Sequence, residues 1–386
     1  MIVAAVLVRA FTVHVPFVRT QALVGQTVRL SGPAPRPAWP SEGQAAVEVE
    51  GLGSLGTSGA QAPVPTASVA KVMTAYLTLQ QSPIHDGDDG FTMTVTHDDV
   101  ADYRHRLALG QSTVPVRVGE RLTEREALEA LMLPSANNVA AMLAEHAAGG
   151  TADFVEDMNA TAARLGMRST TYTDPSGYNA TTVSTAADQV KLARVAVRIP
   201  AFVQIAALPS AVIPVAGEVT NFNGLVGHGG YVGIKTGSDS AAGGCLVFAK
   251  RFVVDGHHLT VIGAVMGQRD GSLIPAALNA GQRLGDSAAA AVRLRNAIPS
   301  GGRVLTATGT DNHSVDVLAR RPLREIGFGG TTVPLSLSLA PPTKQLTAGQ
   351  PVAIVHASGL VSPTVAAVAA KPLPKPSFGW RLRHVF

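Results

Sequence analysis

Apolar residues recur at helical spacing through much of the chain. Positions three and four residues apart share one face of a helix, and from Ser68 onward such positions are mostly apolar. The stripe consists of Val69, Val72, Met73, Tyr76, Leu77 and Gln80. The same pattern predicts further helices over residues 123–132, 138–148, 151–166, 184–198 and 272–297.

Shorter apolar or alternating segments predict strands between these helices. They lie at residues 45–50, 113–118, 244–250 and 259–266. The first of them is followed by Gly51-Leu52-Gly53-Ser54-Leu55-Gly56, which matches the pattern G-x-G-x-x-G of dinucleotide-binding proteins. In those proteins a helix follows the glycines, whereas Pro63 and Pro65 follow them here. We therefore predict a glycine-rich hairpin turn and no nucleotide site.

The character of the sequence changes after residue 298. Over residues 303–370, Val, Thr and Ser alternate between Gly and Pro breaks, without a helical period. This pattern predicts a small, separate all-β domain over residues 299–370. The change of period therefore separates a β domain from the preceding region of predicted helices and strands.

The two ends of the chain and the segment before the first strand have unusual compositions. Residues 1–17 are apolar, but Arg9 interrupts them and they lack a basic start and a small-residue cleavage site. They are either a degenerate signal or anchor, or an ordinary apolar segment. Residues 18–43 are rich in Pro and Arg and predict an extended linker. Residues 371–386 are proline-rich and then aromatic and basic, which fits either contact with a membrane surface or a disordered tail.

Composition narrows the possible functions. The 386 residues are 46% hydrophobic and 15% charged, which indicates a folded chain with more than one domain. The net charge is +4, but the basic residues are scattered and aromatic residues make up only 5%, so we expect no nucleic-acid partner. Cys245 is the only cysteine and lies in an apolar run, which predicts a buried core residue.

Three short motifs bring together the residue types needed for a serine nucleophile without histidine. Ser68 and Lys71 are three residues apart in a predicted helix, so the hydroxyl and the amine share one face. A serine needs a base beside it, and lysine acts as one only when desolvation or a second cation lowers its pKa. Ser135-x-Asn137 lies between two predicted helices, and Lys235-Thr236-Gly237 is the only K-T-G in the chain.

With these motifs in this order, the sequence resembles the serine penicillin-recognising enzymes over residues 44–298. It is most similar to the D-alanyl-D-alanine carboxypeptidases among the low-molecular-mass penicillin-binding proteins. The resemblance implies the α+β fold of the β-lactamase and transpeptidase type, an antiparallel sheet flanked by helices. Members of this family often carry a trailing β domain, to which residues 299–370 would correspond.

The resemblance also implies roles for the residues of the motifs. Ser68 would be the nucleophile, and Lys71 would accept its proton with its pKa lowered by Lys235. Ser135 would relay the proton to the leaving amine, and Asn137 would hold the substrate amide and the lysine. No metal and no cofactor is implied.

Substrate binding is expected along the third motif. Lys235 and Thr236 would hold the terminal carboxylate, and Gly237 would leave room for the peptide. The backbone N–H groups of Ser68 and Ser238 would form the oxyanion hole. The middle motif has Ala136 where relatives commonly have glycine. Arg269 is either a residue that assists carboxylate binding or an ordinary surface arginine.

The implied substrate is a peptidoglycan stem pentapeptide ending in D-Ala-D-Ala, cleaved through an acyl-enzyme that β-lactams would also form. Such a substrate requires an extracytoplasmic protein, either secreted or membrane-anchored. A D,D-endopeptidase would use the same site, and a non-catalytic wall-binding scaffold is a further alternative. A β-lactamase is disfavoured because Glu156-x-x-Asn159 is one residue too short and lies in a predicted helix.

Overall fold

The computed structural model describes residues 2–85 and 87–385, and these form two units. The larger unit comprises residues 36–291, and the smaller unit combines the N-terminal segment up to Pro35 with the chain from Val292 onward. Met1, Asp86 and Phe386 lie outside the described residues, so the predicted N-terminal segment and tail each lack one residue here.

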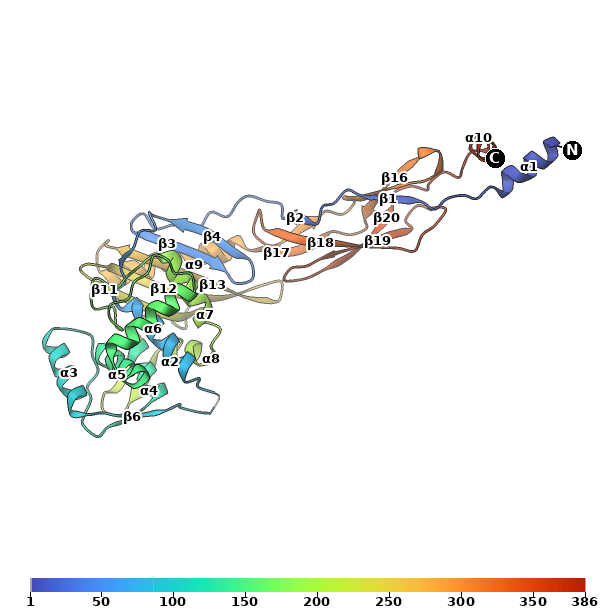
Figure 1. The fold of residues 1–386 in the computed structure, drawn as a ribbon. Coiled ribbons are helices and arrows are strands. Elements are labelled where there is room, and N and C mark those ends of the chain that lie inside the picture. Colours follow the sequence, from blue (N-terminus) through green and yellow to red (C-terminus); the bar gives the residue numbers. More distant parts are fainter. Residues whose placement is uncertain (1, 86, 386) are drawn as a thin grey trace. The chain divides into compact units, whose positions relative to one another are not determined.

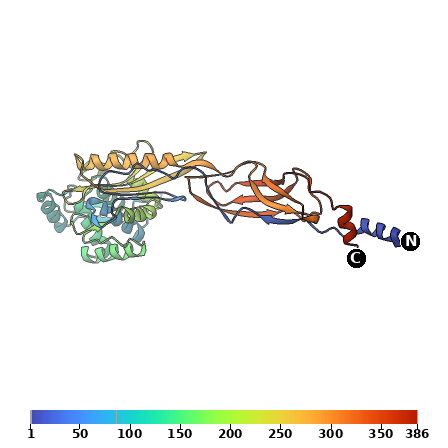
Figure 2. The same ribbon diagram turned by 90° about the horizontal axis from the view of Figure 1, so that it is seen from above.

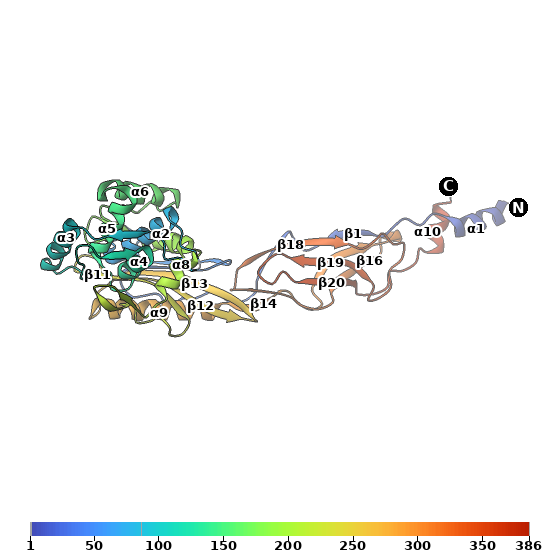
Figure 3. The same cartoon turned by 90° about the horizontal axis from the view of Figure 1, so that it is seen from below.

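The larger unit is built on a five-stranded antiparallel sheet with the strand order β11-β12-β13-β3-β4. The strands are β3 (Gln44–Val49), β4 (Gly53–Ser58), β11 (Tyr231–Asp239), β12 (Gly243–Val254) and β13 (His257–Gln268). Helix α9 (Leu273–Ala291) packs on one face and α7 (Ala186–Ala196) on the other (Figures 1 and 3). Figure 2 shows α9 in orange along the sheet. The predicted hairpin is confirmed, because β3 and β4 pair across the Gly51 turn.

The remaining helices of the larger unit gather beyond α7. They are α2 (Lys71–Gln81), α3 (His97–Ala108), α4 (Glu124–Met132), α5 (Asn137–Ala148), α6 (Thr151–Arg164) and α8 (Pro200–Ala206), and the 3-10 turn η1 (Ala67–Ala70) precedes α2. Short strand pairs connect them: β5 (Val64–Pro65) with β8 (Val183–Ser184), β6 (Thr92–Thr94) with β7 (Arg121–Thr123), and β9 (Ser210–Ile213) with β10 (Gly217–Thr220).

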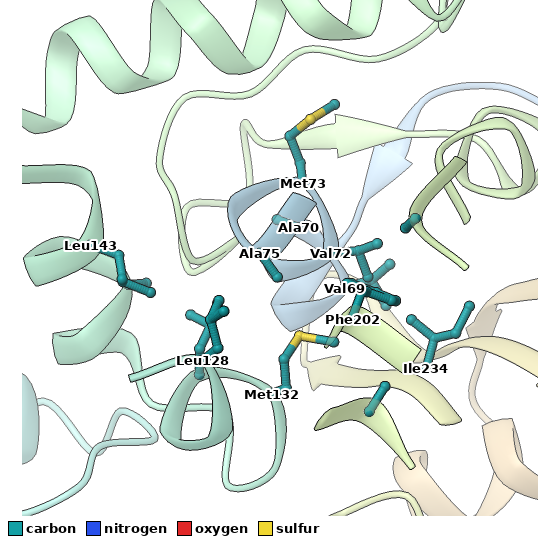
Figure 4. Close-up of a cluster of buried hydrophobic side chains, with 14 of the residues drawn as sticks. Val69, Ala70, Val72, Met73, Ala75, Leu128, Met132, Leu143, Phe202 and Ile234 are labelled. Atoms are coloured by element: carbon teal, nitrogen blue, oxygen red, sulfur yellow. The ribbon is translucent and has the colours of Figure 1, made fainter. Parts of the chain in front are cut away.

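Helix α2 runs through the core of the larger unit. Figure 4 shows Val69 and Val72 close to Phe202 of α8 and Ile234 of β11, with Met132 of α4 nearby. All five side chains are buried. The apolar stripe predicted from Ser68 onward therefore packs against helices and the sheet alike, which fixes the start of α2 from several sides.

Several predicted elements differ from the structure in their bounds. The helix predicted over 184–198 is α7, and Thr185 caps it by accepting a hydrogen bond from the backbone N–H of Asp188. The predicted strand 113–118 does not form. Its Val114 backbone instead exchanges hydrogen bonds with the side-chain amide of Asn138, at 3.1 and 3.0 Å. A buried amide therefore takes the place of a partner strand.

The smaller unit contains a seven-stranded sheet with the order β1-β15-β16-β20-β19-β18-β2 and the pair β14-β17. Its strands are β1 (Arg19–Ala22), β2 (Thr27–Arg29), β14 (Arg293–Ile298), β15 (Arg303–Thr308), β16 (Ser314–Ala319), β17 (Leu323–Gly327), β18 (Thr332–Leu339), β19 (Pro351–Ala357) and β20 (Thr364–Ala369), with the 3-10 turn η2 (Thr310–Asn312). The helix predicted over 272–297 ends at Ala291, because the following residues form β14 and pair with β17.

The segment 18–43 is not simply a linker. Strand β1 pairs with β15 and β2 pairs with β18, so both edges of the seven-stranded sheet come from this segment. Leu30 is buried in the core of the smaller unit, and Val24 and Val28 pack against that core. The two strands have only three or four residues and lie among prolines and arginines. They are therefore too short to show the alternation of apolar and polar residues from which a strand is predicted.

Both ends of the described chain are helical. Helix α1 (Ile2–Thr12) and helix α10 (Phe378–Arg383) contact each other, with the ring centroids of Phe11 and Phe378 separated by 6.0 Å. Within the described part of the chain, no helix combines the length and the apolar character needed to cross a membrane.

Burial of the 18–43 segment predicts a stability effect. Leu30→Ala is expected to lower the free energy of unfolding of the smaller unit by about 2–5 kcal/mol, because it removes a buried leucine. Leu23→Ala is the matched control, since Leu23 is 46% exposed in the same segment. Urea unfolding of the full chain measures both. Equal midpoints for the two variants would show that the segment is a linker after all.

Candidate active site

The amine of Lys71 is the centre of a buried polar cluster. Its Nζ lies 2.9 Å from Oγ of Ser68, 2.6 Å from Oδ1 of Asn137 and 3.0 Å from the carbonyl oxygen of Ser176. Lys71 itself has no exposed surface. Because η1 is a 3-10 turn, residues three apart eclipse each other, which places the serine hydroxyl directly beside the lysine.

A protonated amine could donate to all three oxygens, and a neutral amine can also make all three contacts. A neutral lysine has two N–H donors and one lone pair, whereas the carbonyl oxygens of Asn137 and Ser176 can only accept. When Lys71 is neutral, its two N–H groups point to these oxygens, and its lone pair is left for the hydroxyl of Ser68. In this arrangement Lys71 is placed to take the proton of Ser68.

The surroundings of Lys71 favour its neutral form. Burial lowers its pKa well below 10.5, and the cation of Lys235 lowers it further. Asp174 acts in the opposite direction, and Arg106 adds a smaller lowering. Lys235 is also buried, and its pKa falls to about 7 for that reason. The second basic side chain that sequence analysis required is thus close enough to Lys71 to act on its pKa.

A turn that sequence analysis did not assign to the site supplies the third contact of Lys71. The carboxylate of Asp174 organises it by accepting from the backbone N–H of Ser176 at 3.2 Å and of Tyr178 at 3.0 Å. Gly177 has a φ of +76°, and a Cβ there would lie 1.9 Å from the carbonyl oxygen of Ala67. The turn therefore packs directly on η1. The run Asp-Pro-Ser-Gly is its only signal in the sequence.

Ser135 lies in the break between α4 and α5 in a strained conformation. Its φ is +68°, which is unfavourable for a residue with a side chain. The backbone is held on both sides, because Ala136 donates its N–H to Ala130 and Asn137 donates its N–H to Ser112. Among the described residues, the buried Oγ of Ser135 has no hydrogen-bond partner. It is thus available to a substrate group.

The third motif lies on β11, against the turn that carries Ser68. Lys235 and Thr236 are buried, and Ser238 is exposed. A Cβ at Gly237 would lie 2.9 Å from the backbone nitrogens of both Ser68 and Val69. Any larger residue would press on the backbone that is predicted to bind the oxyanion. The structure thus brings all three motifs into one region of the larger unit.

Other candidate residues have structural contacts. The guanidinium of Arg269 donates to the carbonyls of Ser240 and Ala241, so it braces the turn between β11 and β12. The amide of Asn159 in α6 bonds the backbone of Tyr172, and Glu156 is exposed. Cys245 is buried as predicted, and burial raises its pKa to about 12.

The buried Lys235 predicts a pH dependence of stability. Between pH 7 and pH 10.5 its amine is protonated in the unfolded chain and largely neutral in the folded one. Unfolding then takes up a proton, so the free energy of unfolding rises with pH by up to about 1.4 kcal/mol per pH unit. Lys235→Met is expected to reduce this slope between pH 7 and 10, measured by urea unfolding. Lys344→Met, which removes an exposed amine, is the control; an unchanged slope in Lys235→Met would contradict the prediction.

Comparison with known proteins places this site in a family. A family model described as D-alanyl-D-alanine carboxypeptidase matches residues 53–270. The D-alanyl-D-alanine carboxypeptidase DacB2 of Mycobacterium tuberculosis is 38% identical over 185 residues, which cover 46% of this chain and 59% of that protein. A D-alanyl-D-alanine endopeptidase of Pseudomonas aeruginosa is 30% identical over 192 residues, covering 48% and 58%. The chain thus spans a little under three fifths of the length of these two relatives.

Solved structures agree with the sequence relatives. The DD-transpeptidase of Streptomyces K15 superposes with a TM-score of 0.56 at 27% identity, covering 68% of this chain and all of that one. A peptidoglycan synthesis regulatory factor from Streptococcus pneumoniae has a TM-score of 0.58 at 23% identity over 86% of this chain and 98% of its own, and shows the fold alone. The predicted α+β, transpeptidase-like fold is confirmed. With its family-model match across more than half of its length, the chain belongs to the D-alanyl-D-alanine carboxypeptidase family of serine peptidases.

Proposed function

We propose that this protein is a serine-type D-Ala-D-Ala carboxypeptidase. It removes the terminal D-alanine from peptidoglycan stem pentapeptides through an acyl-enzyme on Ser68. The observation that carries this proposal is the buried amine of Lys71, whose 2.9 Å contact with Oγ of Ser68 joins nucleophile and base. The family relationship supports the reaction class.

Acylation follows from the contacts of Lys71. Its lone pair takes the hydroxyl proton while Oγ of Ser68 attacks the carbonyl carbon of the penultimate D-alanine. The backbone N–H groups of Ser68 and Ser238 stabilise the oxyanion. The C–N bond then breaks, and the proton passes from Lys71 through Ser135 to the leaving amine. Water later hydrolyses the ester and restores the serine.

Recognition of the terminal carboxylate falls to the third motif. Lys235 and Thr236 lie on β11 beside the Ser68 turn, where Gly237 lets a peptide backbone approach. The pKa of Lys235 is about 7 without substrate. A carboxylate beside it stabilises the charged form, so substrate binding makes Lys235 a cation while Lys71 stays the base. The two lysines thereby have different roles in one site.

The same chemistry sets the partners and the location. A β-lactam presents a strained amide and a carboxylate, so it would acylate Ser68 and block the site covalently. Because the stem peptide lies outside the cytoplasmic membrane, we assign the protein to an extracytoplasmic location, secreted or membrane-anchored. The pair α1 and α10, with exposed Phe11 and Phe378 and nearby arginines, supports contact of the termini with a membrane surface.

A D,D-endopeptidase that cleaves cross-links between stem peptides is the second candidate. The observation in its favour is the similarity to the Pseudomonas aeruginosa protein that bears this name. Both activities use the same acyl-enzyme, so they differ in which peptides reach Ser68 and not in the chemistry.

Covalent labelling tests the nucleophile. Fluorescent penicillin is expected to label the wild-type protein. Ser68→Ala is expected to abolish the label, because Ser68 supplies the only hydroxyl hydrogen-bonded to Lys71 among the described residues. Ser54→Ala, in strand β4 of the same unit, is the control and should keep full labelling. An adduct that survives Ser68→Ala would refute the assignment.

Product analysis separates the two candidate activities. Incubation with a stem pentapeptide is expected to release free D-alanine faster than the protein cleaves cross-linked muropeptide dimers. Ser68→Ala should lose both activities, since they share one nucleophile. Faster cleavage of dimers would instead make the protein an endopeptidase.

A further inference from the structure

A hydrogen-bonded chain connects the surface of α3 with the amide of Asn137. The Oε1 of Gln111 accepts from Nδ2 of Asn137 at 2.8 Å and from Nη1 of Arg106 at 3.3 Å. Nε of Arg106 donates in turn to Oδ2 of Asp102 at 2.6 Å. None of these three partners belongs to the sequence motifs, and they come from α3 and the loop that follows it.

The chemistry of this chain has a fixed direction. Aspartate only accepts hydrogen bonds and arginine only donates them, so Arg106 must meet an oxygen atom of Gln111. The same oxygen of Gln111 also faces Asn137, and it can accept a hydrogen bond only from the NH₂ group of the Asn137 side chain. The Oδ1 of Asn137 is therefore turned toward Lys71, where it lies 2.6 Å from Nζ.

The orientation of the Asn137 amide decides what the lysine can do. With Oδ1 toward Lys71, the amide accepts an N–H and leaves the lone pair of Nζ to the hydroxyl of Ser68. With the amide reversed, its NH₂ group would donate to that lone pair. The base would then be occupied, and the proton of Ser68 would have no acceptor.

We propose that Gln111 is a positioning residue for the reaction, and that the Arg106–Asp102 pair fixes it in the orientation that keeps Oδ1 of Asn137 on Lys71. This inference rests on the proposed function. Its physical basis is a chain of hydrogen bonds in which groups that can only donate alternate with groups that can only accept. The chain begins at the partly exposed pair, in which the side chain of Arg106 is 23% and that of Asp102 35% exposed, and it ends at the fully buried Lys71. Arg106 also adds positive charge, and the other charged groups that act on Lys71 are Lys235 from β11 and Asp174 from the turn on η1.

Two near-isosteric variants of Gln111 separate orientation from packing. Gln111→Met has no hydrogen-bonding oxygen, whereas Gln111→Glu keeps one that accepts from both Arg106 and Asn137. We expect Gln111→Met to slow acylation by fluorescent penicillin roughly 10- to 100-fold across the pH range. Gln111→Glu should retain the rate at high pH within about threefold, while its acidic limb moves to higher pH because the added anion favours protonated Lys71.

Variants of α3 test the origin of the orientation. Arg106→Met should slow acylation and move the acidic limb to higher pH, because it removes both the donor to Gln111 and a cation near Lys71. Arg104→Met removes an exposed arginine of the same helix and should change neither quantity. Thermal unfolding of each variant checks that it is folded.

The outcomes distinguish this inference from the proposed function. A wild-type protein that takes no label overturns both. If the wild-type protein is labelled, and the Gln111→Met variant is folded and acylates at the wild-type rate, only the role of Gln111 is overturned. Equal slowing in Gln111→Met and Gln111→Glu at high pH also overturns it, since only the oxygen atom at position 111 is needed to orient the amide of Asn137.

Discussion

The site depends on keeping one amine out of water. Lys71 is fully buried, and desolvation is the largest cause of its lowered pKa. A lysine in water would hold its proton at neutral pH and could not serve Ser68 as a base. Burial alone would leave polar atoms unsatisfied, so the oxygens of Asn137 and Ser176 are needed as partners. The fold supplies these partners from two different segments.

This requirement explains features that otherwise look unfavourable. The glycines at 177 and 237 belong to segments that pack on η1, and Ser135, with its positive φ, lies two residues before Asn137, which contacts Lys71. At both glycines a Cβ would collide with the backbone of that turn or press on it. Strained or side-chain-free backbone thus also lies where the chain must approach the serine closely. The surrounding core, with α2 at its centre, holds these segments in place.

The two units are stabilised by different kinds of core. The larger unit buries a helix-rich core around α2, and at its centre the amine of Lys71 is held by hydrogen bonds to the oxygens of Asn137 and Ser176. The smaller unit has an apolar core within a β-sheet whose two edges both come from residues 19–29. The N-terminal segment is therefore part of the same compact unit as the C-terminal quarter of the chain.

Much of the site was determined by the sequence alone. Ser68 and Lys71 are three residues apart, so any helical turn brings them together, and this needs no tertiary information. The K-T-G motif and the serine–asparagine motif indicated a second cation and a break between helices. The trailing β domain followed from the change of hydrophobic period, and the α+β fold of the preceding region followed from the family resemblance that the motifs carry.

Only the tertiary structure decided the contacts between segments distant in the chain. The contacts made by the carbonyl of Ser176 and the amide of Gln111 could not be predicted from the sequence. A single hydrogen bond to a buried residue produces no repeating pattern along the chain. The short strands β1 and β2 form because partner strands and a core exist for them, and not because of their own propensity. Local spacing thus determined the nucleophile and its base, while long-range packing decided how they are desolvated and oriented.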